Sequence, residues 1–248
     1  MLTQPTLEKL RRMRLVGMAE ALADQMRLAD YQALSFEERF GLLVDQEWTY
    51  RQDRRQARLL KEAKLRLCAC PEDVDYQTPR GLDRALMNSL FNGQWITQHQ
   101  NVLITGPTGV GKTFIACALA QAAIRLGFSA RYWRLSRLLS ELALARADGS
   151  YQKLVSYLAK TEVLVLDEWG TAPLNPAECR ELFEVIDDRA QKRSTVIASQ
   201  LPLEAWHAVF ADPTIADAIL DRLVHNAHKI NLRGESMRKV LAATLSKE

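Results

Sequence analysis

The sequence predicts an α/β protein with a five-stranded parallel sheet, preceded by a small all-helical N-terminal domain. Between residues 7 and 67, apolar residues recur at spacings of three and four, which is typical of helices. From residue 101 onward, short β-branched and aliphatic runs alternate with helix-length segments. The stretch 71–79 between these regions shows little periodicity. We therefore expect two domains, residues 1–70 and 71–248.

The helical region contains one clear start signal and one clear stop signal. Ser35 followed by Glu38 is a capping-box pattern, which predicts that a helix begins at about Phe36. The pair Cys70-Pro71 is expected to end that long basic helix, because proline cannot continue it.

The second region contains five candidate strands and the helical patterns between them. A short helix is expected at residues 84–91, and the strands are expected at residues 101–105, 129–134, 162–166, 195–199 and 228–232. Apolar strands separated by helices imply right-handed crossovers and a sheet covered on both faces.

Composition excludes several classes of protein. The 248 residues provide for one α/β domain with a buried core and a smaller accessory region. No run approaches the 18 apolar residues of a membrane span, and the N-terminus lacks a signal-peptide pattern, so we expect a cytoplasmic protein without membrane contact. The four cysteines lack the paired spacing of a zinc site.

A glycine-rich loop lies between the first expected strand and a helix, as a Walker A phosphate-binding loop requires. Its residues are Gly106, Pro107, Thr108, Gly109, Val110, Gly111, Lys112 and Thr113. The glycines allow consecutive N–H groups to face a phosphate, and the helix N-terminus adds positive potential. Lys112 is expected to reach the β- and γ-phosphates of ATP, and Thr113 to bind Mg²⁺.

Two acids follow the third strand in the manner of a Walker B motif. Four aliphatic residues precede Asp167 and Glu168, so the acids emerge at the carboxyl end of a buried strand. We expect Asp167 to hold Mg²⁺ through water and Glu168 to orient or deprotonate the attacking water. In isolation such an Asp-Glu pair is more often a helix cap.

The fourth strand ends in polar side chains. Gln200 is the candidate sensor of the γ-phosphate, with Ser199 next to it. The alternative is an ordinary turn before Pro202.

Positive charge is concentrated in one segment. Residues 51–66 carry seven Lys or Arg against two acids, a balance of +5, whereas the whole chain has +3, so the remainder sums to −2. On a helix, five of these cations would share one face: Arg51, Arg54, Arg55, Arg58 and Lys61. A face of this kind predicts contact with the phosphates of double-stranded DNA. We expect a second set of side chains to pack inward: Leu59, Leu60, Ala63 and Leu67. The alternative is an ordinary solvated face.

With both motifs placed, the chain closely resembles the IstB-like ATPases, the transposition helpers of bacterial insertion sequences, which are related to the DnaC helicase loader and the DnaA initiator. The resemblance rests on Glu47 with the arginines after it and on residues 15–19 (LVGMA), 34–39 (LSFEER), 106–113 (GPTGVGKT), 167–170 (DEWG), 199–202 (SQLP), 221–223 (DRL) and 233–238 (RGESMR). It implies an AAA+ P-loop fold, ATP hydrolysis, self-assembly on target DNA and delivery of a cognate transposase to that DNA.

The resemblance also implies a homo-oligomer with an arginine finger acting in trans. The matching position is Arg222, which would enter the site of a neighbouring subunit and stabilise charge on the transferred phosphoryl group. Without the resemblance, Arg222 would be read as a solvated helix arginine.

One departure from full AAA+ proteins concerns the C-terminal lid, which we expect to be largely absent. About sixteen residues follow the last expected strand, too few for a helical lid with its sensing arginine, although Arg238 is a candidate for that role. A replicative helicase loader of the DnaC type is the alternative function. A small-molecule kinase is less favoured, because it would need a closing lid.

Overall fold

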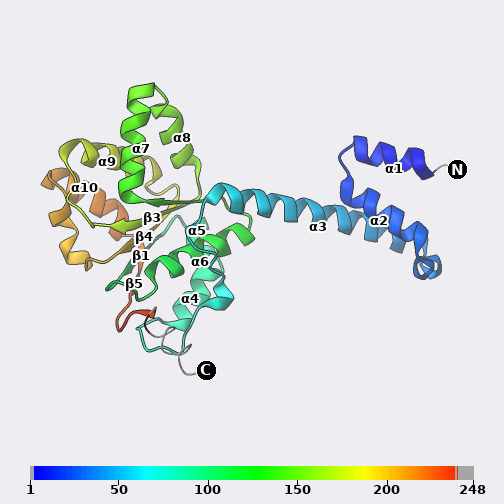
Figure 1. Ribbon diagram of the computed structural model, residues 1–248, viewed down its shortest axis with the longest axis horizontal. Coiled ribbons are helices and arrows are strands. Elements are labelled where there is room, and N and C mark those ends of the chain that lie inside the picture. Colours follow the sequence, from blue (N-terminus) through cyan, green and yellow to red (C-terminus); the bar gives the residue numbers. More distant parts are fainter. Residues whose placement is uncertain (1–2, 238, 240–248) are drawn as a thin grey trace. The chain divides into compact units, whose positions relative to one another are not determined.

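The computed structural model describes residues 3–237 and residue 239, which divide into two compact units. The N-terminal unit is Met1–Arg58 and the C-terminal unit is Leu59–Glu248 (Figure 1). This division comes earlier than the predicted boundary at residue 70, because Leu59 and Ala63 are buried in the core of the C-terminal unit.

The N-terminal unit is helical, as the sequence predicts. Its elements are α1 (Thr3–Arg12), α2 (Val16–Arg27), a 3₁₀ turn (Ala29–Ala33) and the greater part of α3 (Phe36–Ala63). Arg14, with a φ of 60°, separates α1 from α2, a break that the apolar spacing does not indicate. Gly17 lets α2 approach α3 closely, since a Cβ there would lie 2.7 Å from the carbonyl oxygen of Gln46.

The start of α3 is as predicted and its end is not. The backbone N–H of Ser35 donates to Glu38 Oε2 at 2.7 Å, and the N–H of Glu38 donates to Ser35 Oγ at 3.3 Å, which forms the capping box. The helix ends at Ala63 and not at Cys70, because Lys64 adopts a left-handed conformation with a φ of 49°. Residues 64–70 are therefore a connecting segment, not helix.

The described part of the C-terminal unit contains a five-stranded parallel sheet, as predicted. Its strands are β1 (Asn101–Thr105), β2 (Ala130–Arg134), β3 (Val163–Trp169), β4 (Ser194–Ser199) and β5 (Ala227–Asn231), in the spatial order β2-β3-β4-β1-β5. The predicted strands agree closely in position, except that β3 continues through both acids to Trp169.

Helices cover both faces of this sheet (Figure 1). Side chains of alternate residues along the strands enter two separate cores, which explains why the strands are apolar throughout. One face packs against α4 (Arg84–Phe91), α5 (Gln94–Thr97) and α6 (Lys112–Arg125). The other packs against α7 (Leu135–Asp148), α8 (Tyr151–Lys160), α9 (Pro176–Arg189) and α10 (Pro213–Val224). Short 3₁₀ turns lie at Pro71–Asp73, Leu203–Ala205 and His207–Val209.

The strand order brings the carboxyl ends of β1, β3 and β4 together at one end of the strands, called here the carboxyl edge of the sheet. Thr105 at the end of β1 is in register with Ser199 at the end of β4, which pairs with β3 on its other side. Open α/β sheets bind ligands at this edge. Among the described residues, no helix is long and apolar enough to cross a membrane.

Candidate nucleotide-binding site

The loop from Gly106 to Gly111 connects β1 to α6 and curls at its glycines. Gly106 has a φ of 147°, and a Cβ there would lie 2.3 Å from the carbonyl oxygen of Leu232. Gly111 has a φ of 100°, which other residues rarely adopt, and α6 begins at the next residue. The helix N-terminus therefore faces the inside of the loop, where a phosphate binds in such motifs.

Lys112 lies inside this curl. Its side chain is buried, and Nζ donates to the carbonyl oxygen of Pro107 at 2.7 Å. Burial lowers the pKa of the Lys112 ammonium, and the negative charge of Asp167 opposes this effect. A buried ammonium bonded to a single backbone carbonyl retains donors for an anionic ligand.

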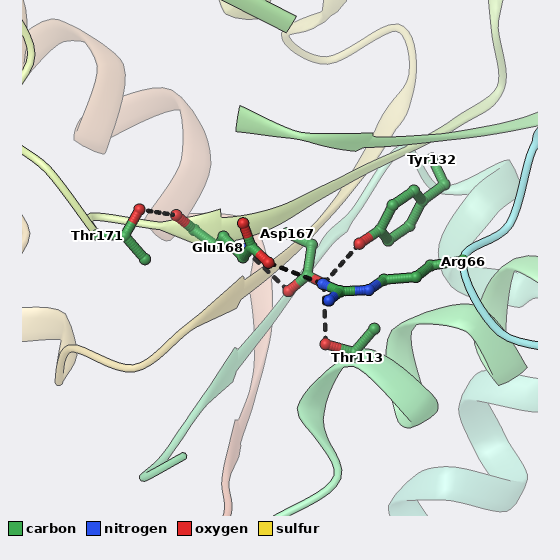
Figure 2. Close-up of polar contacts among 6 residues, drawn as sticks. All are labelled: Arg66, Thr113, Tyr132, Asp167, Glu168 and Thr171. Atoms are coloured by element: carbon green, nitrogen blue, oxygen red, sulfur yellow. Dashed lines mark hydrogen bonds and ion pairs between the residues drawn. The ribbon is translucent and has the colours of Figure 1, made fainter. Parts of the chain in front are cut away.

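The side chains of Thr113, Tyr132 and Arg66 converge on Asp167, the first acid of β3 (Figure 2). Asp167 is 2% exposed, and its Oδ2 accepts hydrogen bonds from Thr113 Oγ1 at 2.8 Å and from the Tyr132 hydroxyl at 2.7 Å. Burial and the bond to Asp167 raise the pKa of Tyr132. A hydroxyl oxygen beside a carboxylate is a donor set that Mg²⁺ prefers, so Thr113 and Asp167 fit that ion.

Glu168 differs from Asp167 in its backbone and its surroundings. A β-bulge interrupts the pairing of β3 with β4 between Leu166 and Trp169, and Glu168 has a φ of 61°. Its side chain is 32% exposed and faces the same cavity as Lys112. A carboxylate at this position can contact a water molecule next to a bound phosphate.

The structure adds one residue that the sequence analysis did not select. Arg66, in the segment after α3, donates from a guanidinium NH to Glu168 Oε1 at 2.7 Å and lies 3.7 Å from Asp167 Oδ2 (Figure 2). Side-chain hydrogen bonds with Tyr132 and Glu168 raise the pKa of Arg66. The sequence places Arg66 only at the end of a basic run, and no local pattern marks its pairing with β3.

These groups line a cavity of 360 Å³ at the carboxyl edge of the sheet. Its lining includes residues of both motifs, of the segment after α3, and of the chain after β4 and after β5: Arg66, Thr108, Gly109, Gly111, Lys112, Thr113, Asp167, Glu168, Gln200 and Met237. The backbone N–H of Met237 donates to the carbonyl oxygen of Gly109 at 2.9 Å, so the chain returns to this loop after β5. Arg238 lies outside the described residues.

The two candidates at the end of β4 behave differently. Gln200 is exposed and lines the cavity, where its Oε1 accepts a hydrogen bond from Thr108 Oγ1 at 2.7 Å. Ser199 is buried, donates to the carbonyl oxygen of Trp169 at 2.9 Å and accepts from the N–H of Leu201 at 3.1 Å. Its hydroxyl thus supports the turn, which leaves Gln200 as the candidate beside the phosphates.

Arg222 lies apart from the other predicted site residues of its own chain. The carbonyl oxygen of Arg222 accepts from Asn101 Nδ2 at 3.2 Å, at the start of β1, whereas the phosphate loop follows the end of β1. Its Nε donates to Asp187 Oδ1 at 2.7 Å, and its guanidinium lies 5.0 Å from the ring centroid of Phe183. The side chain remains partly exposed.

The predicted DNA-binding cations are all exposed on α3: Arg51, Arg54, Arg55, Arg58 and Lys61. Arg51 pairs with the buried Glu47 at 2.6 Å, and the Arg54 guanidinium lies 5.8 Å from the ring centroid of Tyr50. The prediction of the inward set is partly wrong. Leu59 and Ala63 are buried, but Leu60 and Leu67 are exposed, because the helix turns Leu60 away from the core and has ended before Leu67.

Comparisons with known proteins agree with this geometry. The family model for the IstB-like ATP binding protein matches residues 8–243. An insertion-sequence ATP-binding protein of Sinorhizobium fredii is 51% identical over 96% of this chain and 98% of the relative. The ATP-binding protein of insertion sequence IS1162 from Pseudomonas fluorescens is 51% identical over 82% of this chain and 88% of the relative.

Solved structures show the same fold at low sequence identity. DnaI matches with a TM-score of 0.57 and 18% identity over 66% of this chain and 91% of its own. The DnaC helicase loader matches with a TM-score of 0.55 and 17% identity over 66% of this chain and 96% of its own. These likenesses identify an AAA+ P-loop fold, and the family match covers both units: this chain belongs to the IstB-like ATP-binding proteins of insertion sequences.

Proposed function

We propose that this protein is a transposition helper that hydrolyses ATP, assembles on double-stranded DNA and recruits its cognate transposase. The observation that carries the ATPase part is the convergence of Lys112, Thr113, Asp167 and Glu168 on one cavity. Residues from two motifs more than fifty positions apart in the chain meet where phosphates and Mg²⁺ bind in P-loop proteins.

The roles follow from the surroundings of each residue. Lys112 and the N–H groups of the loop would hold the phosphates. Thr113 and Asp167 would hold Mg²⁺, which would neutralise charge on the phosphate oxygens. Glu168, more exposed than Asp167, orients the attacking water and accepts its proton. Gln200 approaches the γ-phosphate from the end of β4.

The position of Arg222 supports assembly. A cation at the opposite edge of the sheet cannot serve the site of its own chain, but it can serve the site of a neighbour stacked against that edge. Partial exposure of its side chain leaves the guanidinium accessible, and its partner Asp187 would be exchanged for a phosphoryl group. We therefore propose a homo-oligomer with Arg222 acting in trans.

DNA contact is assigned to the exposed cations of α3. Arg146, an exposed arginine on α7, is less suited to this role, because it lies 2.9 Å from Glu181 and 3.6 Å from Glu184. The transposase partner is inferred from the names of the relatives, which are proteins of insertion sequences. The likeness to DnaC keeps a helicase loader as the alternative, although at 17% identity it concerns the fold alone.

The test is a co-sedimentation experiment on linear duplex DNA. With a non-hydrolysable ATP analogue and Mg²⁺, the protein is expected to sediment with DNA and to retain its cognate transposase. With ADP, both should be released. Retention of a replicative helicase in place of the transposase would support the loader, and sedimentation that is indifferent to nucleotide would contradict both functions.

A further inference from the structure

A cation from outside both nucleotide-binding motifs occupies the acidic side of the cavity. Arg66 donates to Glu168 at 2.7 Å and lies 3.7 Å from the oxygen of Asp167 that accepts from Thr113 (Figure 2). The guanidinium therefore lies beside the two groups that would bind Mg²⁺ and next to the acid that would activate water.

The pairing compensates a charge that the other neighbours leave. Asp167 is almost fully buried, and the groups that donate to it from Thr113, Tyr132 and the backbone N–H of Glu168 are neutral. Burial lowers the pKa of Lys112, which is close enough for the charge of Asp167 to oppose that effect, but its ammonium donates to the carbonyl oxygen of Pro107. A buried carboxylate is costly without a nearby positive charge, and Arg66 supplies one.

The Arg66 side chain is also free to leave. It is 41% exposed, so its guanidinium can return to water without opening the core. It belongs to the segment 64–70, which begins where α3 ends. Leu65 and Ala69 of this segment pack in the core, whereas residues 66–68 between them are exposed.

We propose that Arg66 is a positioning residue which pairs with Asp167 and Glu168 until Mg²⁺ arrives with a nucleotide and displaces it. This inference rests on the proposed role of the two acids. A divalent cation at Thr113 and Asp167 would lie close to a guanidinium that is 3.7 Å from the same carboxylate, and like charges at such distances repel. Displacement frees Glu168 for water and loosens the exposed residues 66–68, while Leu65 and Ala69 keep the segment packed on the core.

The first test measures nucleotide affinity with Mg²⁺ and with a chelator, using a fluorescent non-hydrolysable ATP analogue. Arg66→Ala should raise the affinity with Mg²⁺, relative to the affinity with the chelator, about threefold to fivefold, because Mg²⁺ no longer competes with a fixed cation. This is the range expected for a partly exposed ion pair. Arg66→Lys should restore much of the parent ratio. Lys64→Ala, which removes an exposed cation two residues earlier, is the matched control and should leave the ratio unchanged.

The second test follows the segment itself. Cys68 is exposed two residues after Arg66, and a fluorophore can be attached there in a Cys70→Ser background. Adding the analogue with Mg²⁺ should lower the anisotropy of this label in the parent. In Arg66→Ala the anisotropy should already be low and should not respond.

The outcomes separate this inference from the proposed function. An unchanged affinity ratio in Arg66→Ala would overturn the proposed displacement. Weaker binding of the analogue with Mg²⁺ would also overturn it, because Arg66 would then be a phosphate ligand. A label that responds equally in both proteins would overturn it as well. If the parent failed to bind the analogue with Mg²⁺, the proposed function would fall, and this inference with it.

Discussion

At the scale of single residues, the two neighbouring acids of β3 acquire different roles from the backbone. Both side chains line the cavity. Asp167 is paired with β2 and almost fully buried, whereas Glu168, left-handed at the bulge, is partly exposed. A non-glycine residue with positive φ carries strain, which is often found at functional sites. This difference is consistent with the proposed roles, Asp167 as a ligand of Mg²⁺ and Glu168 as a contact of water.

Lys112→Ala should weaken ATP binding about tenfold to a hundredfold. Hydrogen bonds to charged groups contribute about 1.5–3 kcal/mol each, and the loop amides alone would then face the phosphate charge. Equilibrium binding of a fluorescent ATP analogue measures the effect. Unchanged affinity would show that the loop is not the phosphate site.

Glu168→Gln should give a different result, because it removes the proton acceptor and leaves Thr113 and Asp167 in place. We expect ATP binding to persist while turnover falls by about 10²–10⁴. Phosphate release and analogue binding should be measured on the same preparation. Normal turnover in this variant would remove Glu168 from the proposed chemistry.

The site was partly predictable at this scale. The Walker A residues and the acidic pair follow from short spacings within one strand and loop, which the sequence displays directly. Arg66 could not be found in this way, since it pairs with a residue 102 positions away. Only the folded chain brings the connecting segment to the end of β3.

At the scale of elements, most strands and helices follow from local patterns. The capping box at Ser35 and the proposed span of α4 are reproduced, because caps and apolar periods are local. The end of α3 was missed, because Lys64 ends the helix in a left-handed conformation that glycine usually adopts. The predicted stop at Cys70-Pro71 marks a 3₁₀ turn, not the end of a helix.

The exposed cations of α3 lead to a prediction about DNA. Arg54→Glu with Arg58→Glu should weaken binding to unrelated duplexes alike and flatten the salt dependence, whose slope is about −0.9 per phosphate neutralised. A salt titration with two duplex sequences measures both effects, and ATP binding should be unaffected.

Arg180→Glu with Lys192→Glu is the matched control, because it makes the same change in net charge at exposed positions on and beside α9. Equal losses in both double variants would show that net charge alone governs binding. No loss in the α3 variant would move the DNA site elsewhere.

At the scale of the whole molecule, the proposed arginine finger lies away from the nucleotide-binding site of its own chain. The phosphate loop follows the carboxyl end of β1, whereas Arg222 lies beside the amino end of the same strand. A chain whose Arg222 edge is stacked against the loop edge of a neighbour would complete the site of that neighbour, so we expect activity to depend on protein concentration.

Arg222→Ala should retain ATP binding and lose about 10³–10⁵ in turnover, as other arginine fingers do. Mixing it with Lys112→Ala protein should restore part of the hydrolysis, because one partner supplies an intact loop and the other an intact finger. Steady-state phosphate release at increasing ratios of the two variants measures the rescue. If assembly is shown by sedimentation and no rescue occurs, Arg222 is structural.

The aromatic cluster directly after the acidic pair has a practical consequence. Trp169 follows Glu168 in the chain, is buried, and lies 5.2 Å from Trp206 and 6.1 Å from Phe210 between ring centroids. Indole emission responds to small changes in polarity and in the orientation of nearby rings. The protein thus contains an intrinsic optical reporter one residue from its proposed catalytic acid, readable by stopped-flow fluorescence without an added dye.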